Sequence, residues 1–135
     1  MLGKEFTLGK NERLKQRKFI DRLFKEGRSF SVFPFRIFYL FANELPAPLQ
    51  AGFSASTRNF KRAVDRNRIK RLTKEAYRLQ KKELNAQIIS KNQKLAVFFI
   101  YTDKNLPAFG IIKERVQTIL QKLITVVHEM DSSHS

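Results

Sequence analysis

The stretch "KRAVDRNRIKRLTKEAYR", residues 61–78, combines a dense positive charge with a helical pattern of apolar residues. Eight of its eighteen residues are Lys or Arg. At 100° per residue, four apolar side chains fall within about 80° of one another: Ile69, Leu72, Ala76 and Leu79. We therefore expect a helix from residue 62 to about residue 84 that packs through this stripe.

A second set of side chains in the same stretch would repel one another on a helix. Basic residues recur at every fourth position: Arg66, Lys70, Lys74 and Arg78. Like charges at this spacing destabilise an isolated helix by about 0.2–0.5 kcal/mol per pair. Between residues 61 and 82, only Asp65 and Glu75 offset ten basic residues. This imbalance favours a polyanionic ligand, most simply a nucleic acid, over a merely solvated face.

The charge of the whole chain supports the same interpretation. Its 135 residues include 27 Lys or Arg and 12 Asp or Glu, a net charge of +15 that attracts polyanions over a long range. The absence of cysteine excludes disulfides, thiolate metal sites and thiol catalysis. No apolar run approaches the roughly 20 residues needed to cross a bilayer, and the first 20 residues lack the apolar core of a signal peptide, so we expect a cytoplasmic protein.

The remaining segments predict a single α+β domain. Helical spacing of apolar residues predicts helices at 15–26 and 111–127, and Gly27 stands where the first should end. Aromatic and β-branched residues predict a strand at 33–41, and shorter apolar runs predict strands at 50–57 and 94–102. We expect the domain to span residues 1–128 and the tail, residues 129–135, to be disordered.

The central motif resembles the signature of the protein subunit of bacterial ribonuclease P. The resemblance is carried by Arg66-Asn67-Arg68, followed by Ile-Lys-Arg-Leu at 69–72, and it extends over roughly residues 8–127. It implies a ribosomal protein S5 domain 2-like fold with the order α-β-β-β-α-β-α and a small mixed sheet. It also implies a left-handed β-α-β crossover, a handedness that most such connections avoid.

The resemblance implies a function without protein catalysis. Proteins of this family act as cofactors of a catalytic RNA that removes the 5′ leader of precursor tRNA with the help of Mg²⁺. The implied partners are the ribonuclease P RNA and precursor tRNA, without an obligate protein partner or a membrane. We expect the side chains to bind no cofactor, since His128 and His134 lie near the C-terminus and no acidic cluster stands out.

Two RNA-contacting surfaces are implied. The first would bind the catalytic RNA and the start of the leader, and its candidate residues are Arg58, Lys61, Arg62, Arg66, Asn67, Arg68, Lys70, Arg71, Lys74 and Arg78. The second, the predicted leader cleft, would hold the unpaired leader through Phe19, Ile20, Arg36, Phe38, Ser54 and Ser56. We expect Arg36 and Phe38 on the open face of their strand, because Arg36 would be costly to bury, with Phe35 and Tyr39 facing the core.

The sequence departs from the family pattern at two places. The family often carries a basic residue where Thr57 stands and a cleft aromatic near Ile20. A ribosomal or general RNA-binding protein without a role in tRNA cleavage would share the charge and fold class, but it would not need the Arg-Asn-Arg run. A DNA major-groove reader is disfavoured because the basic helix follows a sheet rather than two short helices. A membrane-surface helix is disfavoured because the core needs the apolar stripe.

Overall fold

The computed structural model describes residues 9–132, with side chains up to residue 129. Within them the chain forms a mixed α+β domain with a four-stranded sheet. The elements in chain order are η1 (Lys10–Glu12), α2 (Arg17–Glu26), β1 (Arg28–Val32), β2 (Phe35–Phe41), β3 (Leu49–Ala55), α3 (Ala63–Gln80), α4 (Lys82–Ser90), β4 (Leu95–Tyr101) and α5 (Phe109–Ser132).

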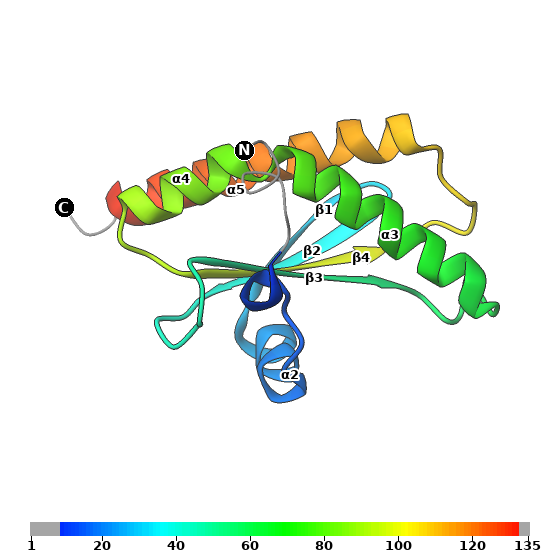
Figure 1. The fold of residues 1–135 in the computed structure, drawn as a ribbon, viewed down its shortest axis with the longest axis horizontal. Helices are drawn as coiled ribbons and strands as arrows, with labels where there is room; N and C mark the ends of the chain where they lie inside the picture. The colour runs from blue at the N-terminus through cyan, green and yellow to red at the C-terminus, as the bar shows by residue number, and fades with distance from the viewer. Residues whose placement is uncertain (1–8, 133–135) are drawn as a thin grey trace.

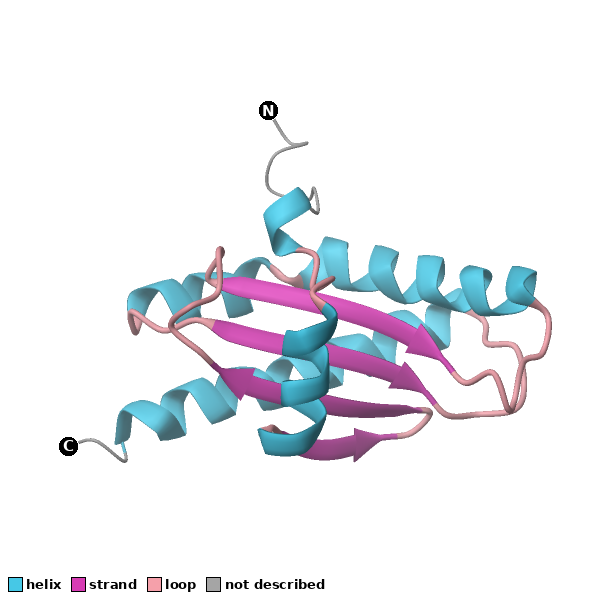
Figure 2. Ribbon diagram, turned by 90° about the horizontal axis from the view of Figure 1, so that it is seen from below, coloured by secondary structure: helices cyan, strands magenta, loops and turns pink. Residues whose placement is uncertain are grey.

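The sheet mixes antiparallel and parallel pairs. Its order is β1-β2-β4-β3, so the last strand in the chain lies between the second and the third. β2 pairs antiparallel with β1 and with β4, whereas β3 and β4 run parallel. A parallel pair needs a long connection, and here α3 and α4 supply it. Figure 2 shows α2 crossing the strands in front of this sheet.

The helices divide unequally between the two faces of the sheet. In Figure 1, α3, α4 and α5 lie on one face and α2 lies alone on the other. The larger core fills the three-helix side, where Ile37, Phe99 and Ile69 are fully buried. A smaller core lies under α2 and includes Leu23 and Phe98. The three-helix face is therefore the closed side, and part of the α2 face remains accessible.

The sequence prediction of the elements was correct in order but incomplete. The strand β1 was not recognised from the residues, although the family resemblance included it. It is an edge strand whose alternate residues, Ser29 and Ser31, are exposed, so its apolar content is low. The strand predicted from residue 33 begins at Phe35, because Phe33 and Pro34 form the turn after β1. The basic helix breaks at Lys81 into α3 and α4.

The predicted packing stripe of α3 was only half correct. Ile69 and Ala76 are fully buried, but Leu79 is 36% exposed and Leu72 is only partly buried. Thr73 and Tyr77 are buried instead. The Thr73 hydroxyl donates a 2.8 Å hydrogen bond to the Ile69 carbonyl oxygen, which satisfies the polar group inside the core. The large Tyr77 ring packs against Phe53 and Phe99, which turns the helix toward β3 and β4.

The boundary predicted between the domain and its C-terminal tail, at residue 129, lies within α5. α5 continues to Ser132, so residues 129–132 are helical and the expectation of disorder from residue 129 was wrong for them. The apolar stripe ends near Val127, but a helix packed along most of its length can continue for another turn beyond its last buried residue. The expectation for residues 133–135, and the placement of His134, lie outside the described residues.

Candidate nucleic-acid interface

The first turn of α3 is fixed by one of the candidate RNA-binding residues. Arg66 donates hydrogen bonds from Nη1 to the carbonyl oxygens of Phe60 (2.8 Å) and Lys61 (2.9 Å). These carbonyls belong to the loop that enters the helix, and Phe60 itself is buried in the larger core. Arg66 is half-buried as a result. Its guanidinium therefore has a structural task in the free protein, which the sequence did not indicate.

The other candidates on α3 are exposed to different degrees. Asn67, Arg68 and Arg71 are exposed, and Lys70 and Lys74 are half-buried. Arg78 pairs with Glu75 through Nη2 and Oε1 at 2.5 Å, so its charge is partly neutralised within the helix. The hydrogen bond between this pair raises the pKa of Arg78 and lowers the pKa of the Glu75 carboxyl. Of the four basic residues at every fourth position of α3, Arg78 is therefore the one whose charge is offset by a carboxylate on the same helix.

The loop before α3 adds exposed cations. Arg58, Lys61 and Arg62 are exposed, and Arg62 lies 3.9 Å from the carboxylate of Asp65. The Arg58 backbone N–H donates to Ser56 Oγ at 3.1 Å, so Ser56 stabilises the turn after β3. Ser56 was predicted to line the leader cleft, but here its hydroxyl is a turn contact.

A short N-terminal segment, residues 9–15, lies against the outer edge of β3. We call it the strap. The Leu14 N–H donates to the Ala51 carbonyl oxygen at 2.9 Å, and Gln50 Nε2 donates to the Asn11 carbonyl oxygen at 2.7 Å. Leu14 is 5% exposed and belongs to the core under α2. The strap thus covers an edge strand that would otherwise present unpaired backbone groups.

The strap, β3 and α3 enclose a hollow of about 340 Å³, which we call the basic groove. Its lining comes from the strap, the β3 edge and the first half of α3: Arg13, Leu14, Lys15, Ala51, Gly52, Phe53, Asn67, Lys70, Arg71 and Lys74. Five of these described lining residues are cationic and none is acidic. The groove therefore presents donors and positive charge from two walls that are distant in sequence.

The cations of the basic groove lie close enough together to affect the protonation of Lys74. The pKa of Lys74 is lowered, first by burial and then by the nearby charges of Arg13, Lys15 and Lys70. The like charges thus disfavour protonation of Lys74 in the free protein. An anion between the walls would remove this repulsion, so the groove is suited to a phosphate backbone.

Sequence reasoning named four groove residues on α3 but missed both basic residues of the strap. Asn67, Lys70, Arg71 and Lys74 were predicted, whereas Arg13 and Lys15 were not. The only local signal is their charge in a segment without helical or strand periodicity. Their position opposite α3 depends on the pairing of residue 14 with residue 51, which is a long-range contact.

Most of the predicted leader cleft lies on the α2 face. One row of paired residues crosses all four strands on this face: Ser31, Arg36, Ile100 and Ser54. We call it the open row. Arg36 is exposed, and its guanidinium carbon lies 5.2 Å from the centre of the Phe38 ring in the next row. The orientation predicted for β2 is therefore confirmed, since Phe35 is 1% exposed on the opposite face.

The contribution of α2 to this surface differs from the prediction. Phe19 is 9% exposed and packs within the core under α2, so it is a core residue rather than an open platform. Ile20 is half-buried against the same core. Phe24, which was not predicted, is 40% exposed and its ring lies 5.0 Å from that of Phe38. The α2 aromatic residue in contact with Phe38 is thus Phe24, one turn further along the helix than Ile20.

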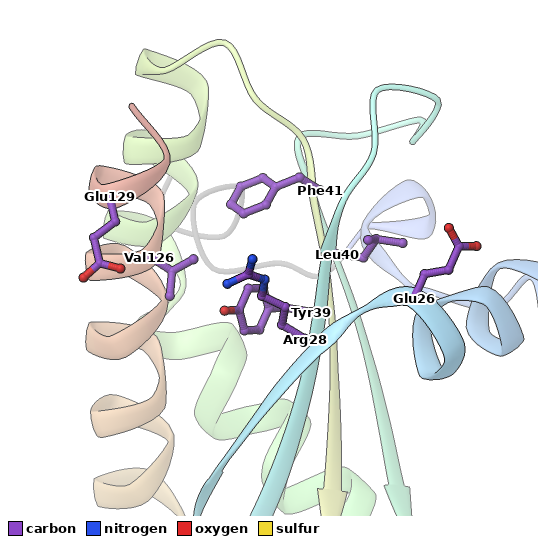
Figure 3. A pocket seen from close by; sticks show the side chains of 7 residues that line it. All are labelled: Glu26, Arg28, Tyr39, Leu40, Phe41, Val126 and Glu129. Atoms are coloured by element: carbon purple, nitrogen blue, oxygen red, sulfur yellow. The ribbon is translucent and has the colours of Figure 1, made fainter. Parts of the chain in front are cut away.

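A larger hollow of about 410 Å³ lies elsewhere, at the end of β2 that β1 does not cover. Figure 3 shows Arg28, Tyr39 and Phe41 pointing toward Val126 and Glu129 of α5, with Leu40 and Glu26 on the other side of the strand. Its charged residues are of both signs, so it lacks the uniform field of the basic groove. The size of a pocket is therefore a poor guide to the nucleic-acid interface here.

Two further features of residues 9–132 bear on function. No helix among them is long and apolar enough to cross a membrane. In this part of the chain, no three His, Asp or Glu side chains gather into a group that could hold a metal ion.

Comparison with known proteins identifies the family. Residues 8–124 match the family model described as Ribonuclease P. The ribonuclease P protein component of Porphyromonas gingivalis is 36% identical over 129 residues, which cover 95% of this chain and 92% of that protein. The corresponding protein of Chlorobium phaeobacteroides is 29% identical over 129 residues, covering 87% and 88%.

The fold agrees with a solved structure. The RNase P protein of Staphylococcus aureus superposes with a TM-score of 0.65 at 20% identity, over 82% of this chain and 93% of that one. This likeness supports the mixed α+β architecture alone, whereas membership rests on the sequence. Because the family model covers most of the chain and the P. gingivalis relative matches nearly all of it, this protein belongs to the ribonuclease P protein family.

Proposed function

We propose that this protein is the protein component of a ribonuclease P ribonucleoprotein, which removes the 5′ leader of precursor tRNA. The observation that carries this proposal is the basic groove, because it unites the Arg-Asn-Arg helix with two strap cations around a hollow without acidic lining. Family membership supplies the reaction. Cleavage itself belongs to the RNA subunit, together with the Mg²⁺ that the reaction needs, and the protein contributes no catalytic residue.

The basic groove binds the backbone of the catalytic RNA. Arg71 and Lys74 on one wall and Arg13 on the other can contact phosphates from opposite sides. Asn67 adds an amide that can both donate and accept a hydrogen bond, which suits sugar and base edges. Neutralising RNA phosphates in this way releases condensed counterions and lowers the Mg²⁺ concentration that the ribonucleoprotein requires.

The open row and the residues beside it bind the single-stranded leader. Phe38 offers a half-exposed ring on which a base can stack, and Arg36 beside it can pair with a phosphate. Ser54 and Ser31 add hydroxyl groups in the same row. A surface with one cation and one aromatic ring suits a flexible single strand better than a rigid duplex.

Three finer statements complete the proposal. The fold is ribosomal protein S5 domain 2-like with a left-handed crossover from β3 through α3 to β4. The parallel pairing of these strands supports the crossover, and the family resemblance supports its handedness. The protein works in the cytoplasm, where its RNA partners are found. It needs no second protein for binding.

The decisive experiment is a cleavage assay with precursor tRNA and a bacterial ribonuclease P RNA at a low Mg²⁺ concentration. We expect the RNA alone to be slow, the protein alone to leave the substrate intact, and the two together to cleave at the mature 5′ end. Cleavage by the purified RNA-free protein would contradict the proposal. RNA binding without any stimulation of cleavage would instead support the alternative of a general RNA-binding protein.

A further inference from the structure

The strap provides one wall of the basic groove and is joined to the sheet by few hydrogen bonds. Backbone contacts join Leu14 to Ala51, and a side-chain contact joins Gln50 to the backbone of Asn11. Only a single-residue bridge, between Arg13 and Ala51, links the strap to the sheet as a strand would. One isolated bridge is weak compared with a continuous ladder of strand pairs.

Besides the burial of Leu14 in the core under α2, the strap is attached by an ion pair between distant parts of the chain. Lys81 Nζ lies 2.5 Å from Glu12 Oε1, and the exposed fractions of the two side chains are 6% and 29%. Lys81 stands at the break between α3 and α4. The other carboxylate oxygen of Glu12 accepts a 2.7 Å hydrogen bond from the Gly9 N–H. The carboxylate thus joins the strap to the far end of α3 and also stabilises the local turn.

The strap needs such an attachment because its positive charges are repelled by those of α3. Arg13 and Lys15 on the strap carry the same charge as Lys70 and Lys74 on α3. Burial first, and then the charges of Arg13, Lys15 and Lys70, lower the pKa of Lys74. Without a compensating contact, movement of the strap away from α3 would lower the electrostatic free energy of the protein when no anion is bound. Glu12 is the acidic residue of the strap, and it faces Lys81 rather than the groove.

We propose that Glu12 is a positioning residue for RNA binding. Its ion pair with Lys81 holds the strap beside α3 and thereby keeps two cations at the groove. The carboxylate touches no RNA. This inference rests on the proposed function of the groove, and it assigns to an acidic residue a favourable effect on the binding of a polyanion.

The proposal can be tested by two substitutions that change the net charge in opposite directions. Glu12→Gln adds one positive charge, and Lys81→Met removes one. If both act by releasing the strap, both should weaken binding of a bacterial ribonuclease P RNA transcript and lower the salt dependence of its affinity. Loss of two phosphate contacts lowers the slope of log K against log salt by about 1.5. If only net charge matters, Glu12→Gln should strengthen binding while Lys81→Met weakens it.

A double variant and a control complete the experiment. The double variant Arg13→Ala with Lys15→Ala removes both strap cations, so it sets the largest decrease expected in the slope of log K against log salt. Adding Glu12→Gln to this double variant should change RNA binding almost not at all. Glu114→Gln on α5 makes the same charge change on an exposed side chain that is not part of the groove lining, and it should leave binding unchanged or slightly stronger. Additive effects of Glu12→Gln and the double variant would overturn the proposal.

Hydrogen exchange measures the strap without RNA. In Glu12→Gln, the Leu14 amide should exchange faster while the amides of β2 and β4 keep their protection. General loss of protection would overturn the proposal, because the pair would then support the whole fold rather than the strap. If the wild-type protein fails to bind the RNA at all, the proposed function itself fails. Normal wild-type binding with an unaffected Glu12→Gln variant contradicts only the role of Glu12.

Discussion

The basic groove and the open row are both suited to RNA, but their chemistry differs. The groove gathers five cations and one amide around the edge of β3, and its single aromatic lining residue, Phe53, is largely committed to the core. The open row offers one cation, Arg36, beside the half-exposed ring of Phe38. Charge without stacking suits a backbone of any sequence, whereas a ring with one charge suits unpaired bases.

The difference follows from how each surface is built. The groove is formed by two like-charged walls, the strap and α3, and the packing of α3 on the larger core places one of them. The open row lies on the α2 face of the sheet, where Arg36 and Ser31 are exposed. Salt should therefore act strongly on binding at the groove and weakly on binding at the open row.

The largest effect is expected from removing two groove cations. Lys70→Ala with Lys74→Ala should weaken binding of the catalytic RNA by about 2 to 3 kcal/mol, roughly 30- to 150-fold, and lower the salt slope by about 1.5. Filter-binding titrations at several salt concentrations measure both quantities. Lys113→Ala with Lys122→Ala removes the same charge from α5, outside the groove, and should have a much smaller effect. Equal losses in the two double variants would mean that net charge, not the groove, determines affinity.

The second effect concerns the open row. Phe38→Ala should weaken binding of precursor tRNA by about 1 to 3 kcal/mol, or roughly 5- to 150-fold, and leave mature tRNA nearly unaffected, because only the precursor carries a single strand to stack. The salt slope should not change. Phe38→Leu keeps apolar contact with Phe24 but lacks the flat ring, so it separates packing from stacking. Equal weakening for precursor and mature tRNA would argue against a leader contact.

A third prediction concerns the core beneath the groove. Among the described residues, the buried Tyr77 hydroxyl has no hydrogen-bond partner, and burial, together with the charge of Glu12, raises the pKa of Tyr77 far above its ordinary value. Tyr77→Phe removes the unsatisfied oxygen and keeps the ring contacts with Phe53 and Phe99. We expect the free energy of unfolding in urea to rise by about 1 kcal/mol without a change in RNA affinity. A loss of stability would indicate that the hydroxyl has a favourable role in the folded state.

The residues themselves explain which parts of this picture could be predicted from sequence. The basic helix and the exposed side of β2 were predicted, because local periodicity and the cost of burying Arg36 determine them. Ile69 was correctly placed in the core, but the stripe was misjudged at Leu79, because the buried side of α3 passes through Tyr77, whose ring contacts Phe99. The residue types alone favour Leu over Tyr and Thr at core positions.

The missed residues depend on contacts between distant segments. Arg13 and Lys15 face α3 only because Leu14 pairs with Ala51, and no local pattern encodes that pairing. The structural role of Arg66 likewise depends on how the loop from β3 returns to the helix. Its replacement by Ala should cost stability as well as RNA affinity, whereas the exposed Arg68 can be replaced with little loss of stability.

The smallest effect tests whether the groove is maintained at the expense of stability. The pKa of Lys74 is lower in the folded protein than in the unfolded chain, so its charge destabilises the fold at neutral pH. Lys74→Gln should therefore raise the free energy of unfolding in low salt by about 0.2–0.5 kcal/mol, the size of a single like-charge repulsion on a helix. As pH rises through the lowered pKa, wild-type Lys74 loses its proton, and the advantage of the variant should disappear. High salt should also reduce the stability advantage of the variant, because ions screen the repulsion from Arg13 and Lys15.

Urea unfolding at neutral and alkaline pH, compared with Lys113→Gln as a control, measures these differences. If Lys74→Gln is less stable than the wild type at neutral pH, Lys74 makes a favourable contact in the free protein, and the groove is not a site where stability is given up for RNA binding.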